Sequence, residues 1–186
     1  PFGLAVQRGN IQNFTAVNKF GYNSAVGTSY ETIHDGNNLY TYASSAGTAT
    51  VTSSDTSSDN NGTVEIQGLD ENYNLQTVTA TIGGSATTEQ FIRVFRVRMT
   101  SANTGTANVG VISVTVSSTV VAKIAAAEGQ TLMAVYTIPA KHTGYIISVN
   151  GSSSKDLENT FRIRARNVDE DAFNTKDFFT TRGGMQ

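Results

Sequence analysis

The feature that most constrains the fold is a recurring pattern of short β-prone segments separated by polar turns. In Thr63–Leu69, Val64 and Ile66 alternate with polar residues, and a similar alternation of apolar residues with Thr runs through Leu75–Ile82. Alternation of this kind places the apolar side chains on one face of a strand. Because such segments recur along most of the chain, the sequence favours packed β-sheets over helices.

The pattern predicts an all-β fold, a β-sandwich of jelly-roll or immunoglobulin-like type. Turn signals rich in Asp, Asn and Gly lie between the segments, at 35–38, 59–62, 83–84 and 150–152. The predicted strands are Leu39–Tyr42, Thr48–Ser53, Thr63–Leu69, Leu75–Ile82, Gln90–Met99, Val109–Ser117, Val120–Ile124, Thr131–Ile138, Tyr145–Asn150 and Thr160–Val168.

Three local expectations refine this picture. The apolar phase changes between Val111 and Ile112, which predicts a bulge or bend there. The segment Ala122–Glu128 also fits one turn of helix, so two interpretations stay open for it. The stretch Thr131–Asn150 is rich in β-branched and aromatic residues and is interrupted at Pro139, so it predicts a strand, a turn and a strand at the centre of the sandwich.

The two ends of the chain carry aromatic residues without any regular period. We therefore divide the chain into an extended N-terminal arm (1–30), a sandwich body (31–171) and an extended C-terminal arm (172–186). A buried Phe contributes on the order of 2 kcal/mol, so a few aromatic anchors can hold an arm against a partner. The candidate docking anchors are Phe2, Phe14, Phe20, Phe178 and Phe179. The alternative, that the arms fold back on their own body, is equally open.

Arginine gathers in two predicted strands, FIRVFRVRM and FRIRARNV. Strand geometry puts Arg162, Arg164 and Arg166 on the face opposite Phe161 and Ile163. If the two arginine strands pair, a cationic face results, which suits acidic partner groups. The alternative is a solvated face that is balanced by neighbouring acids, namely Glu158, Asp169, Glu170 and Asp171.

Catalytic and metal-binding constellations are not recognisable in the sequence. The chain has no Cys and only 2 His, namely His34 and His142, so it lacks the usual zinc ligands. Two Asp/Asn-rich turns, 55–61 and 70–72, do not match a calcium-binding loop. We expect no enzyme activity, no cofactor and no metal.

Charge and hydropathy exclude further partner classes. A net charge of −2 with 15% charged residues argues against a nucleic-acid or polybasic membrane partner. The apolar runs are too short to span a bilayer, and the first residues do not resemble a signal peptide, so we expect cytoplasmic synthesis.

One family resemblance spans 17–166. It is carried by VNKFGYNSAVGTSYETIHDG, VEIQGLDENYNLQTVTATIGG, FIRVFRVRM followed by SANTGTANVGVISVT, and QTLMAVYTIPAKHTGYI, in that order. This arrangement resembles a family of virion structural proteins of tailed bacteriophages. The resemblance implies a β-rich accessory protein of the particle and brings no catalytic motif.

Together these observations predict a capsid-decorating or cement protein, located in the virion and made in the host cytoplasm. Its expected partners are the major capsid protein or other virion proteins, with further copies of itself in a homo-oligomer. A neck, tail-adaptor or fibre-associated component is the alternative within the same class. A glycan- or receptor-binding β-sandwich module is the alternative of another class, although the chain has no Trp for stacking on sugars.

Overall fold

The computed structural model describes residues 2–36, 38–154, 157–167, 170 and 172–183. The chain forms two compact units, Pro1–Thr143 and Gly144–Gln186. We call them the N-terminal and C-terminal units.

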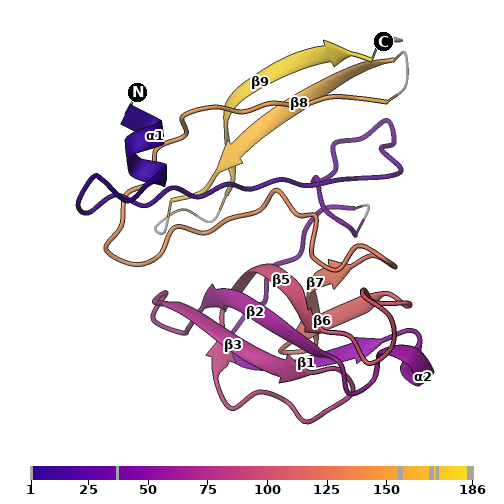
Figure 1. The fold of residues 1–186 in the computed structure, drawn as a ribbon. Helices are drawn as coiled ribbons and strands as arrows, with labels where there is room; N and C mark the ends of the chain where they lie inside the picture. The colour runs from indigo at the N-terminus through magenta and orange to yellow at the C-terminus, as the bar shows by residue number, and fades with distance from the viewer. Residues whose placement is uncertain (1, 37, 155–156, 168–169, 171, 184–186) are drawn as a thin grey trace. The chain divides into compact units, whose positions relative to one another are not determined.

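The N-terminal unit is built from antiparallel sheets, and the predicted all-β, sandwich-like fold is confirmed (Figure 1). A four-stranded sheet has the order β4-β1-β6-β7, and a three-stranded sheet has the order β3-β2-β5. The elements are α1 (Phe2–Gln7), β1 (Gly47–Ser53), α2 (Thr56–Asp59), β2 (Thr63–Leu69), β3 (Leu75–Thr81), β4 (Gln90–Phe91), β5 (Arg93–Ser101), β6 (Ile112–Val116) and β7 (Thr119–Ile124).

One stretch of chain passes from the first sheet to the second. Gln90 and Phe91 pair with β1 of the four-stranded sheet, and from Arg93 onward the chain pairs with β2. At the crossing, the Ile92 N–H donates to the Leu69 carbonyl at 2.9 Å. The two sheets are thereby joined into a curled half-barrel around one core.

The crossing requires a glycine in β2. A Cβ added at Gly68 would lie 2.1 Å from the Arg93 carbonyl oxygen and 2.8 Å from the Phe91 ring, which is closer than packed atoms approach. The register of β2 against β5 shifts between Gln67 and Gly68, at the same place. Phe91 itself is fully buried, so the strand crosses over with its aromatic ring in the core.

The core consists of the alternating apolar residues that the sequence pattern marks. The largest fully buried side chains include Phe91, Ile66, Leu69, Ile82, Ile112 and Ile124. Each contributes roughly 1.5–3 kcal/mol relative to its exposed state, so the N-terminal unit does not depend on disulfides.

The predicted strand Leu39–Tyr42 is irregular in the structure, and that prediction was wrong. Its aromatic residues nevertheless belong to the core region. The Tyr40 hydroxyl donates to the Val121 carbonyl of β7 at 2.8 Å and lies 3.3 Å from the Val94 carbonyl of β5. This hydroxyl thereby bridges the two sheets, while the Tyr40 N–H donates to the Thr32 hydroxyl at 2.9 Å instead of to a strand.

The segment 131–138 is extended but is not a strand of either sheet, which corrects the predicted central strand. The Thr131 N–H donates to the Val97 carbonyl at 2.8 Å, and the Thr131 hydroxyl accepts from the Val97 N–H at 3.1 Å. The Thr131 hydroxyl thus accepts the hydrogen bond that a backbone carbonyl would accept in a regular sheet, and the pairing of this segment with β5 ends there. Met133 and Val135 are buried, but Ala134 and Ile138 on the other face are exposed, so the segment is not covered on both sides as a central strand would be.

Other local expectations also change. The chain bends at 109–110, β6 begins at Ile112, and the register irregularity lies between Val114 and Thr115 instead of at Val111. The stretch 122–128 is the end of β7 followed by a turn, without a helix.

The C-terminal unit is a two-stranded antiparallel sheet of β8 (Glu158–Ala165) and β9 (Asn174–Arg182) (Figure 1). This corrects the predicted boundary at 171/172, because β8 was assigned to the sandwich body and β9 to an extended arm. The two strands pair with each other and form a hairpin. The segment Tyr145–Asn150 carries no strand, and Val168 of the predicted strand lies outside the described residues.

A buried carboxylate ties the start of the N-terminal unit's sheets to a distant loop. Asp59 is only 2% exposed and accepts hydrogen bonds from the Ser53 hydroxyl at 2.6 Å, the Val109 N–H at 2.7 Å and the Gly110 N–H at 2.8 Å. Burial opposes ionisation, but these three bonds outweigh it and hold the pKa of Asp59 below its ordinary value. The charged form therefore stabilises the fold.

We predict that Asp59→Asn lowers the free energy of unfolding by about 2 kcal/mol, because one acceptor oxygen is replaced by an NH₂ group that faces N–H donors. The stabilisation by the carboxylate is present above the unfolded pKa of about 3.9 and is lost as pH falls through the lower folded value. The variant should lack this acid-side loss in denaturant titrations. Asp55→Asn is the control, since Asn also accepts from the Ser58 N–H as an N-cap. Equal stabilities of the two variants would contradict a special role of Asp59.

Candidate interaction surfaces

The N-terminal arm begins with a short helix, so the expectation of a wholly extended arm was wrong. Phe2 on α1 contacts Phe14 edge-on, with ring centroids 5.4 Å apart. The two rings remain 58% and 47% exposed, and Phe20 is 49% exposed. Three of the predicted anchors are therefore accessible to a partner.

The later part of the arm is held by the N-terminal unit itself. The Tyr22 N–H donates to the Leu132 carbonyl at 3.2 Å, and the Ala134 N–H donates to the Ile33 carbonyl at 2.8 Å. The Leu132 N–H in turn donates to Asp35 at 2.8 Å. Residues 21–35 therefore pack on their own unit, whereas no such bond to the sheets is recorded for the described residues before Lys19.

Lys19 marks the point where the arm reaches β5. Its ammonium donates to the Phe95 carbonyl and lies 5.8 Å from the Phe95 ring. Burial, with a smaller contribution from nearby Arg96, lowers the pKa of Lys19 to about 8. The cation is thus poorly solvated, which is the expected consequence of laying a lysine along a sheet edge.

Two of the predicted arginines, Arg164 on β8 and Arg166 directly after it, lie beside an aromatic ring. The guanidinium groups of Arg164 and Arg166 lie 5.1 and 5.6 Å from the centroid of Phe173. Both side chains are exposed, and Arg162 is half-buried. No carboxylate among the described residues forms an ion pair with Arg164 or Arg166, while Asp169 and Asp171 lie outside that set.

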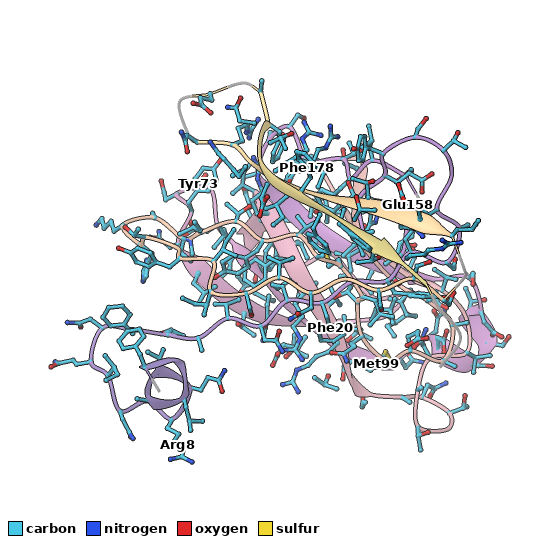
Figure 2. All side chains as sticks on the ribbon, turned by 90° about the horizontal axis from the view of Figure 1, so that it is seen from above. Arg8, Phe20, Tyr73, Met99, Glu158 and Phe178 are labelled. Atoms are coloured by element: carbon cyan, nitrogen blue, oxygen red, sulfur yellow. The ribbon has the colours of Figure 1, made fainter. Side chains whose placement is uncertain are left out.

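The two predicted phenylalanines of β9 occupy different surroundings. Phe179 is opposite Phe161 in the register and stacks on it, with centroids 5.1 Å apart. Phe178 is opposite Arg162 and is 68% exposed (Figure 2). Phe179 therefore holds the hairpin together, and Phe178 is the accessible anchor.

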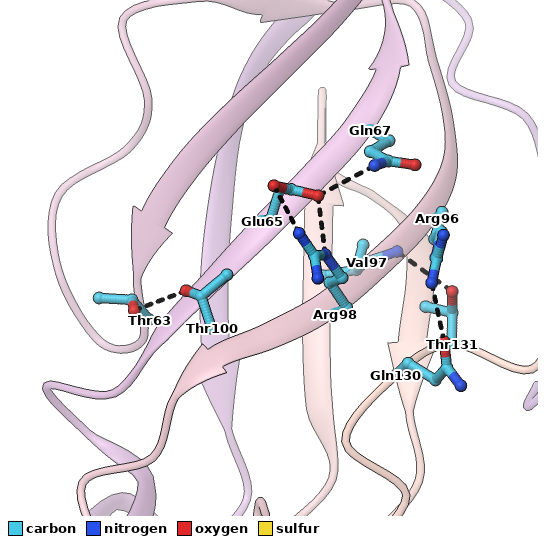
Figure 3. Close-up of polar contacts among 9 residues, drawn as sticks. All are labelled: Thr63, Glu65, Gln67, Arg96, Val97, Arg98, Thr100, Gln130 and Thr131. Atoms are coloured by element: carbon cyan, nitrogen blue, oxygen red, sulfur yellow. Dashed lines mark hydrogen bonds and ion pairs between the residues drawn. The ribbon is translucent and has the colours of Figure 1, made fainter. Parts of the chain in front are cut away.

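The other arginine strand does not pair with β8, so the expected joint cationic face does not form. Arg93 is buried, with its guanidinium 5.0 Å from the Tyr42 ring centroid. Arg98 makes two hydrogen bonds to Glu65, at 2.9 and 3.1 Å, and these bonds lower the pKa of Glu65 (Figure 3). Arg96 donates to Gln130 at 3.2 Å (Figure 3). These arginines therefore interact with residues of the N-terminal unit.

The remaining polar clusters are structural. Among the described residues, no three His, Asp or Glu side chains gather in a way that could hold a metal ion. His34 accepts from the Gly36 N–H at 2.9 Å through Nδ1, lies 3.1 Å from the Asn38 carbonyl through Nε2, and has a pKa that burial lowers. Asp55 caps α2, and Asp70 accepts from the N–H groups of Asn72 and Asn74 at 2.8 Å.

Two surface hollows differ in their lining. One of about 310 Å³ is lined by Asp70, Glu71, Gln76, Glu89 and Gln90, without an aromatic ring for stacking on a sugar. Another of about 370 Å³ is lined by residues that include His34, Tyr40 and Lys123. Within the described chain, no helix has the length and apolar character needed to span a membrane.

Sequence reasoning missed one accessible apolar segment. Tyr145, Ile146 and Ile147 are 74%, 68% and 79% exposed, although they were expected inside the sandwich. The interruption from Pro139 to Gly144 is the signal that could have separated this segment from the body.

Comparison of the chain with protein-family models, with curated proteins and with solved structures returned no match. The resemblance to tailed-phage virion proteins therefore stays a prediction, and the class that the fold defines is an all-β protein with aromatic-rich peripheral segments.

We predict that Gly21→Ala releases the arm from the N-terminal unit. An added Cβ would lie 2.5 Å from the Ile33 carbonyl oxygen and 2.6 Å from the Ala134 nitrogen, so the Ala134–Ile33 hydrogen bond must open. We expect a stability loss of about 1–3 kcal/mol and faster amide exchange at Tyr22 and Ala134. Gly3→Ala is the control, because a Cβ there meets nothing within 4 Å. Unchanged exchange at both amides would contradict docking of the arm.

Proposed function

We propose that this chain is a non-enzymatic structural protein of a tailed-phage particle, which decorates the capsid shell and stabilises it. The supporting observation is the contrast between a complete core in the N-terminal unit and peripheral segments that expose large apolar side chains. Among the described residues, the buried apolar core residues lie between Ala43 and Val135. The described residues before and after that range carry exposed Phe2, Phe14 and Phe178 instead.

Exposed anchors of this kind need a partner. An isolated two-stranded hairpin is marginally stable in water, so packing against a further surface stabilises β8 and β9. Phe178 supplies apolar area for such packing, worth on the order of 2 kcal/mol if fully buried. The neighbouring Arg164 and Arg166 supply donors for carboxylates.

On a closed shell, several weak docking sites on one chain can bind together with high avidity. Anchors at both ends of one chain can engage neighbouring capsomers, and the second contact then forms at a high effective concentration. A protein with several modest contacts can therefore hold a shell without any single strong interface. A neck or tail-adaptor role uses the same contacts with a ring of few copies, and it remains the alternative.

The proposal predicts the location of the chain on the particle. Gold-labelled antibodies against the purified chain should mark the whole capsid surface of the phage that encodes it, because a cement protein repeats with the capsomers. Label confined to the neck or tail would assign the alternative role. Saturable binding of the chain to isolated host glycans, without label on particles, would overturn the proposal in favour of a receptor-binding module.

The arginine pair provides a mutational test. We predict that Arg164→Gln with Arg166→Gln weakens co-sedimentation of the full chain with shells prepared without it, and that the binding of the variant depends less on salt. Both effects follow from losing two exposed cations at a charged interface. Lys141→Gln, an exposed change in the N-terminal unit, is the control. If the salt titrations of parent and double variant coincide, the arginines are an ordinary solvated face.

A further inference from the structure

The three-stranded sheet ends in a strand with an open edge. β3 is first in the order β3-β2-β5 and pairs only with β2 among the described residues. The far edge of β5, by contrast, is covered by Gly129 and Thr131, which bond to Met99 and Val97. The Tyr40 hydroxyl bonds the Val121 carbonyl of β7. The free edge of β1 is bonded by Gly83 and Thr87, whose N–H groups donate to the Val51 and Ala49 carbonyls at 2.9 Å.

Near the start of β3, the Gln76 side chain donates to the Gln90 carbonyl and the Ala140 N–H donates to the Tyr73 carbonyl. Among the described residues, no backbone hydrogen bond reaches the outer edge of Leu75–Thr81 itself, so this edge of β3 is open.

The backbone groups that face this edge follow from the hairpin's hydrogen bonds. The Asp70 N–H donates to the Asn74 carbonyl at 3.0 Å, and the Ile82 N–H donates to the Gly62 carbonyl at 2.9 Å, so both pairs are hydrogen-bonded pairs. Such pairs alternate along an antiparallel ladder. Residues 76, 78 and 80 therefore point their N–H and C=O groups at β2. The same groups of 75, 77, 79 and 81 point outward.

The edge lacks the devices that normally block strand addition. The strand sequence LQTVTAT has no charge and no proline. Its register against β2 is continuous from end to end, without a bulge. Natural edge strands usually carry lysine, proline or a bulge because a bare edge pairs with other chains. A seven-residue edge without any of these is suited to a strand partner.

We propose that β3 pairs antiparallel with β3 of a second copy of this chain about a two-fold axis at Val78. The two three-stranded sheets then form one continuous six-stranded sheet, β5-β2-β3 and its symmetry mate. This inference rests on the strand geometry alone and does not depend on the virion assignment.

With the two-fold axis at Val78, every residue of Leu75–Thr81 lies opposite a residue of the same strand in the second copy. Thr77 lies opposite Thr79 of the partner subunit and Leu75 lies opposite Thr81 of the partner subunit, so every outward-facing residue gains a hydrogen-bonded pair. A centre at Thr77 or Thr79 leaves two residues of the strand unpaired on each copy. Val78, half-buried against the core, meets its own counterpart.

The strand is also self-complementary in chemistry, which favours a second copy over a charged partner. Thr faces Thr across the axis, and cross-strand Thr pairs are favourable. At the ends, the acidic turn with Asp70 and Glu71 meets the region of Gly83 and Gly84 of the partner subunit, so no like charges are opposed. A copy of the same strand therefore fits the edge without a repulsive contact.

The decisive variant is Thr79→Pro in the full chain. Its N–H faces outward, so proline is compatible with the edge strand of the monomer but removes a donor from each copy and places its ring at the interface. Sedimentation should show a concentration-dependent dimer of the parent and a dissociation constant raised by about tenfold or more in the variant. Thr79→Val, which keeps the N–H, should dimerise like the parent.

Two further measurements fix the edge and the register. Dimer formation should protect the amides of Thr77 and Thr79 from hydrogen exchange, while those of Gln76 and Val78 stay protected in both states. The chain has no Cys, so Val78→Cys should form an intermolecular disulfide on oxidation, because opposed residues of a non-hydrogen-bonded pair lie about 4.5 Å apart at Cα. Thr77→Cys should not, since its counterpart is displaced by two residues.

The inference is overturned by a parent that stays monomeric at high concentration, or by a Thr79→Pro variant that dimerises as tightly as the parent. Protection of Thr77 and Thr79 in a monomer would assign the edge to another segment of the same chain. Cross-linking through Thr77→Cys instead of Val78→Cys would overturn the register.

Discussion

The structure depends on the passage of Gln90–Ser101 from one sheet to the other. This stretch pairs first with β1 and then with β2, so it carries the hydrogen bonds of both sheets within a few residues. Gly68 makes the passage sterically possible, and the Phe91 ring fills the core at the crossing. Because the two sheets are joined here, the core of the N-terminal unit closes without help from either end of the chain.

Closure of the core determines where interactions with other molecules are possible. The outer edge of β5 is used by Gly129–Thr131, and the arm from Tyr22 to Asp35 packs beside residues 132–134. Large apolar side chains that stay exposed include Phe2 on α1, Phe178 on β9 and Tyr145–Ile147, together with Leu75 on β3 and Val120 on β7. The fold thus combines a buried core with peripheral segments whose apolar area is accessible.

The sequence predicts those parts of the structure that rest on local alternation. Val64 and Ile66 mark β2 because burial on one face imposes a period of two, and the same reasoning identifies β3. Pairing partners are not local, so FRIRARNV was assigned to the sandwich although β8 pairs with β9. Thr131 shows why a β-prone sequence does not always form a strand. Its hydroxyl accepts the hydrogen bond from the Val97 N–H that a backbone carbonyl would otherwise accept, so the pairing with β5 ends there. The arginines illustrate the same point, since spacing alone does not distinguish Arg93, buried against Tyr42, from exposed Arg164.

The open edge of β3 and the exposed side chains of the peripheral segments differ in what would limit the strength of a contact made there. The open edge of β3 offers backbone hydrogen bonds, whose net contribution is about 1 kcal/mol each and which depend on register, not on side-chain charge. The peripheral segments offer phenylalanine area and arginine donors, whose contribution depends on the partner's shape and is weakened by salt. An edge contact between two copies would bring two sets of peripheral anchors into one dimer. The number of linked anchors would then double without any change in the individual contacts. Linking anchors in this way raises the avidity for a surface on which binding sites repeat.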